Sequence, residues 1–312
     1  MAEQQLREPE THHRALLWLV LVVIVLTTLA YSTGRALVLL SLPTSLPFPT
    51  LVPSATPVIA TATAQPPTAT PVPTHTPVPT YVGWEQVEHG LELRRLRVST
   101  EAGMERLTLV RLDPAVFRFR IVYIPRLPRT VGEWGRSDSL VVNAGFFTPE
   151  HRTIGLLIRE GRVYGSPFDD PDEKSPGLFT VTTDGRTEIR SLQEQPYQIG
   201  EPLWQAVESF PLLVRPGSTF GFAPDVFGDS PGRRTVVAQD RDGRILFVVA
   251  SQGHFSLYEL ATFLIESDLD LEVALNLDGG RSTGLWLQVG DTRVEIDSLV
   301  PVPSVIVAER SD

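Results

Sequence analysis

The chain has 312 residues, of which 42% are hydrophobic and 21% charged, a composition typical of a folded protein with a sizeable core. Its net charge of −10 and its pI of about 5.2 argue against a nucleic-acid binder, which normally carries a basic face. The absence of cysteine excludes disulfides, thiolate catalysis and cysteine-ligated zinc.

An apolar segment lies near the N-terminus. Residues 15–34 carry no charge, and about 20 such residues suffice to span a bilayer as a helix. Arg7 and Arg14 precede this segment, whereas the region after it is poor in basic residues, which favours a cytoplasmic tail over residues 1–14. We therefore expect a retained single-pass anchor in the cytoplasmic membrane. A cleaved signal peptide is the alternative, although Thr28–Ala30 is a poor cleavage site inside the apolar run.

The next segment, residues 35–80, is dominated from residue 43 onward by proline, threonine and alanine. Its repeated TPVPT units cannot form helices or sheet ladders and favour an extended, polyproline-type chain. We expect a stalk that holds residues 81–312 outside the cytoplasmic membrane.

Residues 81–312 carry the patterns of a folded domain. Strands are predicted from period-two alternation or short apolar runs in LELRRLRV (91–98), VFRFRIVYI (116–124), SLVVNAGFF (139–147), EVALNL (272–277), GLWLQV (284–289) and SVIVAE (304–309). Asp-Gly turns predict hairpins at residues 182–189 and 238–250. One helix is predicted at residues 256–266, where Ser256 and Glu259 match a capping box. The fold class is therefore α+β: a β-rich single domain of mixed or antiparallel sheets with few helices.

The stretch ALNLDGGRSTG, residues 274–284, predicts a buried strand that ends at Asp278. Gly279 and Gly280 let the backbone approach a ligand closely, and successive N–H groups in such a turn form an anion-binding concavity. Arg281 adds a charge, and Ser282 and Thr283 add donors, next to Asp278 and Asn276. A purely structural Asx turn, in which the aspartate satisfies its own backbone, explains the pattern equally well.

Gly280 to Gly284 also spells G-x-S-x-G, the motif of the serine-hydrolase elbow. In that fold a helix follows the serine, and the catalytic aspartate and histidine come later in the chain. Here the residues after Ser282 alternate like a hairpin, and all six histidines precede Ser282. A serine hydrolase is therefore disfavoured. The lone histidines also lack metal-ligand spacing, so we expect no metal site and no cofactor.

Two further stretches combine a strand with polar groups. Asn143 ends a predicted strand and is followed by Gly145 and two phenylalanines in NAGFF. Arg233 and Arg234 stand at the entry to another strand, and arginine suits the recognition of phosphate or carboxylate. A surface ion pair is the alternative for these arginines.

Taken together and in order, these stretches resemble the phosphodiester glycosidase domain family, whose bacterial members are often labelled exopolysaccharide biosynthesis proteins. The resemblance covers roughly residues 90–310 and rests on NAGFF, IGLLIREGRV, RRTVVAQDRDGRILFVVASQG, SLYELATFLIE and ALNLDGGRST. Each piece alone is weak, but the ordered set is fairly specific. One departure is Arg281, where the family usually has a small residue after Asp-Gly-Gly.

The resemblance implies hydrolysis of a sugar-1-phosphodiester in a cell-surface or extracellular glycan. It implies that Asp278 acts as base or nucleophile, that Arg234 binds the phosphate and that Asn143 contacts sugar or phosphate oxygens. The residues then expected to bind substrate are Gly145, Asn276, Gly279, Gly280, Arg281, Ser282 and Thr283. The main alternative is a non-catalytic module that binds phosphorylated glycans.

Overall fold

The computed structural model describes residues 83–136, 139–168, 175–223 and 230–311, all of which belong to one compact unit. The predicted membrane helix over 15–34 and the stalk over 35–80 lie outside these residues. Within the described part of the chain, no helix is long and apolar enough to cross a membrane.

The largest sheet has eight strands, and every pair of neighbours in it is antiparallel. In spatial order the strands are β1 (Glu85–Glu88), β2 (Leu91–Thr100), β3 (Gly103–Leu112), β14 (Ile245–Phe255), β13 (Gly232–Asp240), β15 (Leu271–Asn276), β11 (Leu212–Arg215) and β12 (Thr219–Phe220). Strands β1 to β3 from the first half of the described domain therefore join strands of its second half through β14, and β13 and β15 follow β14 side by side.

Two five-stranded antiparallel sheets complete the β structure. The first consists of β7 (Arg162–Tyr164), β6 (Leu157–Arg159), β10 (Leu203–Ser209), β8 (Gly177–Thr182) and β9 (Thr187–Ser191). The second consists of β17 (Thr292–Ile296), β16 (Leu285–Val289), β5 (Ser139–Asn143), β18 (Ser304–Arg310) and β4 (Phe117–Tyr123). The β-rich class is thus confirmed, and the described pairings are antiparallel rather than mixed.

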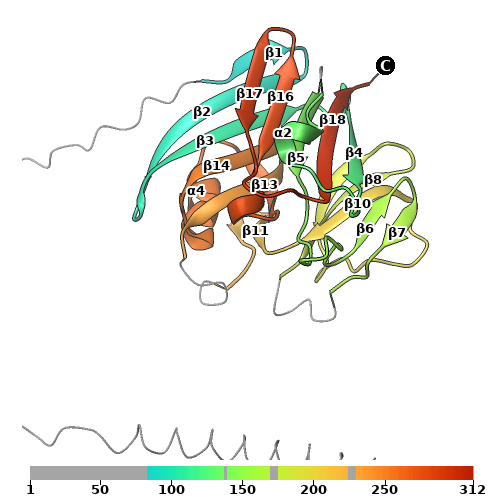
Figure 1. Ribbon diagram of the computed structural model, residues 1–312. Coiled ribbons are helices and arrows are strands. Elements are labelled where there is room, and N and C mark those ends of the chain that lie inside the picture. Colours follow the sequence, from blue (N-terminus) through green and yellow to red (C-terminus); the bar gives the residue numbers. More distant parts are fainter. Residues whose placement is uncertain (1–82, 137–138, 169–174, 224–229, 312) are drawn as a thin grey trace, which may run out of the picture. The chain divides into compact units, whose positions relative to one another are not determined.

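The predicted hairpins and helix form as expected. Both Asp-Gly turns join neighbouring strands, and Gly185 and Gly243 adopt the positive φ angles that such turns require. Helix α4 (Leu257–Glu266) begins after Ser256, whose hydroxyl accepts a hydrogen bond from the Glu259 N–H, while the Glu259 carboxylate accepts one from the Ser256 N–H. The helix packs on one face of the eight-stranded sheet (Figure 1). A second short helix, α2 (Val131–Trp134), packs on β5 and β16.

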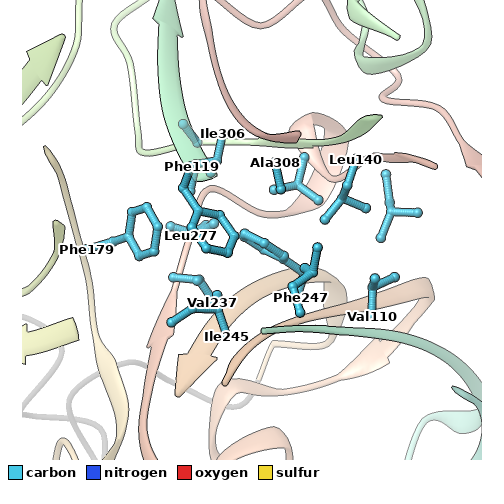
Figure 2. Close-up of a cluster of buried hydrophobic side chains, with 14 of the residues drawn as sticks. Val110, Phe119, Leu140, Phe179, Val237, Ile245, Phe247, Leu277, Ile306 and Ala308 are labelled. Carbon is cyan, nitrogen blue, oxygen red and sulfur yellow. The ribbon is translucent and has the colours of Figure 1, made fainter. Parts of the chain in front are cut away.

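The main hydrophobic core lies where the three sheets meet (Figure 2). Phe119 of β4, Phe179 of β8 and Phe247 of β14 come from different sheets and pack at ring-centroid distances of 5.9 and 6.3 Å from Phe119. Alternation along β13 sends Val237 into this core and Val236 to the opposite face, under helix α4. One face of β13 and β15 therefore packs in the main core and the other packs under helix α4. Neighbouring polar residues at the ends of these strands consequently point into different environments.

The two ends of the described domain are also fixed. The Trp84 ring, just before β1, lies 4.0 Å from the guanidinium carbon of Arg111 and 5.7 Å from that of Arg94. At the other end, Arg310 of β18 forms an ion pair of 3.2 Å with Glu88 of β1. The first and last strands are thus tied to each other across two sheets.

Candidate active site

Asp278 lies just beyond β15, where the strand gives way to a tight turn. Its N–H donates to the Ala144 carbonyl at 3.1 Å, so the turn begins against the segment that follows β5. The Asp278 carboxylate accepts the Gly279 N–H at 2.9 Å. Gly280 has a φ of 58°, a conformation that favours glycine, and begins the short 3-10 helix η1 (Gly280–Ser282). The predicted strand-to-turn geometry is therefore present.

The carboxylate of Asp278 lies in a poorly hydrated environment. Burial disfavours its charged form and raises the pKa of Asp278 from the ordinary 3.8 to about 6. Hydrogen bonds from the Ser282 hydroxyl and the Gly279 N–H act in the opposite direction. Such a carboxylate holds a proton more tightly than an exposed one, yet it is ionised at neutral pH, as a general base requires.

Ser282→Ala should therefore raise the pKa of Asp278 further, because the hydroxyl stabilises the carboxylate and its loss leaves only the backbone donor. The carboxyl carbon signal of Asp278, followed by NMR as a function of pH in the ligand-free protein, gives the titration midpoint directly. The expected result is a midpoint above that of the wild type. An unchanged or lower midpoint would show that the hydroxyl does not interact with the carboxylate in solution.

Arg234 lies on β13, on the face opposite Val237. Its guanidinium is held by two carbonyl groups, through Nε to Phe255 at 3.1 Å and through Nη2 to Ser230 at 2.7 Å. Desolvation lowers the pKa of Arg234, and no described carboxylate forms an ion pair with it. Neutral carbonyls orient this side chain, and because none of the described carboxylates compensates its positive charge, the arrangement favours an anionic ligand.

The register of the sheet brings Arg234 and Asp278 together. Val236 pairs with Asn276 in the antiparallel ladder, and the Leu277 N–H donates to the Thr235 carbonyl at 2.8 Å. Continued by one residue, this register places Arg234 opposite Asp278 on the same face. A Cβ on Gly279 would lie 3.9 Å from Nη1 of Arg234 and only 2.9 Å from the Arg233 carbonyl oxygen. The glycine thus lets the turn lie close against β13.

Asn143 joins this arrangement from β5, but as a buried link. Its Nδ2 donates to the Asp278 carbonyl at 2.6 Å, and its Oδ1 accepts the Gly284 N–H at 3.0 Å and the Thr235 hydroxyl at 2.8 Å. Only 1% of the residue is exposed. We expected Asn143 to contact substrate oxygens. The structure instead uses its amide to hold both ends of the turn.

Two other residues expected to bind substrate, Gly145 and Asn276, lie against backbone carbonyl groups of the protein. A Cβ on Gly145 would lie 2.8 Å from the Glu208 carbonyl oxygen, so this glycine allows β10 to approach the segment after β5. Asn276 is buried, and its amide donates to the Phe210 carbonyl at 2.8 Å. The described contacts of both residues are therefore with the backbone at the end of β10 and just after it.

The remaining residues of the turn differ in exposure. Arg281 is exposed, and its carbonyl accepts the Leu299 N–H at 2.7 Å. Ser282 and Thr283 are buried, and the Thr283 hydroxyl has no hydrogen-bond partner in the described part of the chain. Gly279, Gly280 and Arg281 are thus the part of the turn most open to a ligand.

Other buried carboxylates are already engaged by the backbone. Glu208 accepts the N–H groups of Leu156 at 2.7 Å and Phe168 at 3.2 Å. Glu105 accepts those of Gln252 and His254 at 2.7 and 2.8 Å and so fixes the end of β14, where Phe255 orients Arg234. Among the residues that the structure describes, no group of three or more histidine, aspartate or glutamate side chains is arranged so that it could hold a metal ion.

The surroundings of Ser282 do not resemble a serine-hydrolase elbow. The predicted hairpin follows it, formed by β16 and β17, where the elbow requires a helix. The Ser282 hydroxyl is directed to Asp278 rather than to a histidine base. Of the two motif residues, Asp278 has the environment suited to chemistry.

Thr235 was not singled out by the sequence, although its hydroxyl reaches Asn143. The sequence RRTVV does indicate the direction of the Thr235 side chain, because alternation along a strand places it on the face opposite Arg234. What that face would meet depends on β5, which is far away in sequence.

Comparisons with known proteins concern the family and the fold of this chain. Residues 137–309 match the family described as phosphodiester glycosidase. The fold is similar to that of the catalytic domain of zebrafish N-acetylglucosamine-1-phosphodiester alpha-N-acetylglucosaminidase, auto-inhibited by pro-peptide, with a TM-score of 0.54, 14% identity, and coverage of 75% of this chain and 88% of that one. A hypothetical protein from Synechocystis gives a TM-score of 0.48 at 16% identity, covering 71% of this chain and 62% of that one. A search of curated proteins found no match. The family match extends over more than half of the chain, which therefore belongs to the phosphodiester glycosidase family.

Proposed function

We propose that this protein hydrolyses a sugar-1-phosphodiester at the bond between the anomeric carbon and the phosphate oxygen. One observation carries the proposal. Arg234, a desolvated guanidinium without a described carboxylate partner, lies in register with Asp278, whose pKa is raised to about 6. Family membership is consistent with this activity and supports it.

The two side chains suit the two halves of such a substrate. Arginine recognises phosphate through parallel N–H donors, and a fixed cation stabilises the charge that develops on a departing phosphate. Arg234 and Asp278 are strand neighbours, yet they do not form an ion pair with each other. We infer that the phosphate occupies the region beside Arg234 and that the anomeric carbon faces Asp278.

The reaction then needs no strong general acid, because the phosphate monoester produced by breaking this bond leaves readily as an anion. In one route, Asp278 accepts a proton from water as the water oxygen bonds to the anomeric carbon and the C–O bond electrons pass to the phosphate. In the other route, the Asp278 carboxylate itself bonds to the anomeric carbon, and water hydrolyses the ester in a second step. Both routes give the free sugar and a phosphate monoester.

Hydrolysis in water enriched in ¹⁸O tests this proposal. The purified protein is incubated with a sugar-1-phosphodiester, and the products are analysed by mass spectrometry. The label is expected in the sugar, because the carbon–oxygen bond breaks. Label in the phosphate would show cleavage at phosphorus and would reject a glycosidase mechanism. NMR of the first-formed anomer separates the direct route from the two-step route.

A non-catalytic module for phosphorylated glycans is the competing outcome of the same experiment. It predicts saturable binding of the phosphodiester, measured by calorimetry, with no sugar released over long incubation. The raised pKa of Asp278 favours the enzyme, because a binding site for a phosphate anion gains nothing from a carboxylate in its vicinity.

We also propose that residues 81–312 act outside the cytoplasmic membrane on a cell-surface or extracellular glycan. Support comes from the sequence: the uncharged segment 15–34 and the proline- and threonine-rich residues 35–80. Protease added to intact cells should release a fragment that begins within residues 43–80. Protection of the domain until the cells are lysed would show the opposite orientation.

A further inference from the structure

We propose that Thr235 is a positioning residue, which sets the separation of Arg234 and Asp278 through its hydrogen bond to Asn143. The inference rests on the proposed function for its kinetic consequence only. It goes beyond that function by assigning a role to a residue that contacts neither the phosphate nor the anomeric carbon in the arrangement above.

The direction of each hydrogen bond in this link is fixed by chemistry. The Asp278 carbonyl can only accept, so it faces Nδ2 of Asn143, and the Gly284 N–H can only donate, so it faces Oδ1. The Thr235 hydroxyl, 2.8 Å from the same Oδ1, must therefore donate. Because Asn143, Thr235 and Gly284 are buried, water cannot replace a partner lost from Oδ1 of Asn143 without a local opening.

Thr235 connects three segments at the point where they meet. Its carbonyl accepts the Leu277 N–H from the strand that leads to Asp278, and its side chain reaches Asn143 at the end of β5. Its backbone is continuous with Arg234, whose side chain lies on the opposite face of β13. Thr235 therefore holds the strand of the arginine against both the turn of the aspartate and the asparagine that closes this turn.

Loss of the Thr235 hydroxyl is expected to loosen the turn without removing any group that acts on substrate. A looser turn admits water to Asp278, and hydration lowers the pKa of a carboxylate that burial had raised. Misplacement of a reacting group by about 1 Å can reduce a rate on the order of 100-fold. The lower pKa of Asp278 and the lower rate are both local effects at the site, and each can be measured separately from the stability of the whole protein.

The experiment compares two pairs of variants that differ mainly in the hydroxyl: wild type with Thr235→Val, and Thr235→Ser with Thr235→Ala. The pairs are independent, so a Thr235→Val protein that fails to fold leaves the serine and alanine pair to decide. The first measurement is the NMR titration of the Asp278 carboxyl carbon in ligand-free full-length protein, below the melting temperature of each variant. The second is kcat and KM for the sugar phosphodiester.

In each pair, the variant without the hydroxyl should titrate at a lower pH, between the ordinary 3.8 and about 6. Its kcat should fall about 10- to 100-fold, with Thr235→Ser close to wild type in both measurements. Folded Val and Ala variants whose titration matches that of their hydroxyl-bearing partners would overturn the proposal, even if their melting temperatures fall. If the wild type has no turnover, the proposed function fails, and the titration still decides the role of Thr235.

Discussion

Asp278→Asn is expected to abolish turnover of a sugar phosphodiester and, at the same time, to stabilise the folded protein at pH 8. The amide has the shape of the carboxylate and can still accept the Gly279 N–H. It cannot accept a proton from water or bond to the anomeric carbon. Loss of a positioned base typically reduces a rate by about 10²- to 10⁴-fold, and loss of a nucleophile can reduce it further.

The gain in stability follows from the sign of the pKa change. Asp278 titrates near 3.8 when unfolded and at about 6 when folded, so the folded protein binds the proton more tightly. Stability from this group is complete below pH 3.8 and is lost as pH rises through 6. The full difference corresponds to up to about 3 kcal/mol of unfolding free energy at pH 8, which a neutral asparagine would recover.

Urea unfolding of wild type and Asp278→Asn at pH 4 and pH 8 measures this effect. The two proteins should differ little at pH 4, and the variant should be more stable at pH 8. Asp291→Asn, an exposed position in the turn between β16 and β17, is the matched control. A variant that is inactive and equally destabilised at both pH values would indicate a structural role for Asp278 and would contradict the assignment.

The same pKa gives the pH dependence of the wild type. A base or nucleophile must be ionised, so kcat/KM should rise with pH and level off above about 6. This curve requires substrate whose phosphodiester charge is constant over the range, which holds because a diester has no second ionisation. A rate that falls as pH rises through 6 would mean that the protonated form of Asp278 is the active one.

Arg234→Gln is expected to reduce kcat/KM by about 10²- to 10³-fold, the loss typical when one fixed stabiliser of developing charge is removed. Arg234→Lys should recover only part of this loss, because an ammonium group cannot keep both carbonyl contacts and the parallel donors toward phosphate. Binding of inorganic phosphate, measured by calorimetry, should weaken in both variants.

Arg233→Gln is the control for Arg234, because it removes the same charge from the preceding position of the same strand. The Arg233 guanidinium lies toward the other side, where Nη2 donates to the Asp297 carbonyl at 3.0 Å. Its replacement should change kcat/KM far less. Equal losses in the two glutamine variants would mean that the general positive potential, rather than the placement of Arg234, determines phosphate recognition.

Local patterns predicted most of the strands and the helix that position the site. Alternation in residues 91–98 and 116–124, the two Asp-Gly turns and the Ser256 capping box each depend on neighbours in sequence, and each formed as expected. Strand β3 was not predicted, although it lies next to β2 throughout its length. Its sequence GMERLTLVRL places Glu105 among apolar residues, and only the fold shows that backbone N–H groups from β14 surround that carboxylate.

Sequence also indicated which residues gather at the site, but not what each contacts. Asp278 and Arg234 were identified from a glycine turn and a strand entry, and the sheet register brings them together. The family resemblance implied that Asn143 contacts substrate oxygens. Its actual partners lie on β13 and on both sides of the Asp278 turn, and no local pattern could specify three hydrogen bonds across such sequence distances.

The ion pair between Glu88 and Arg310 has a consequence for protein engineering. It holds the first strand of the domain next to the last one, so the two ends of the folded unit are close in space. Proteins with adjacent termini tolerate circular permutation and insertion into a host protein. Residues 83–311 could therefore be transplanted as a cassette into a surface loop of a carrier, or rejoined end to end and reopened at the exposed turn around Asp291, with β13, β15 and β5 left uninterrupted.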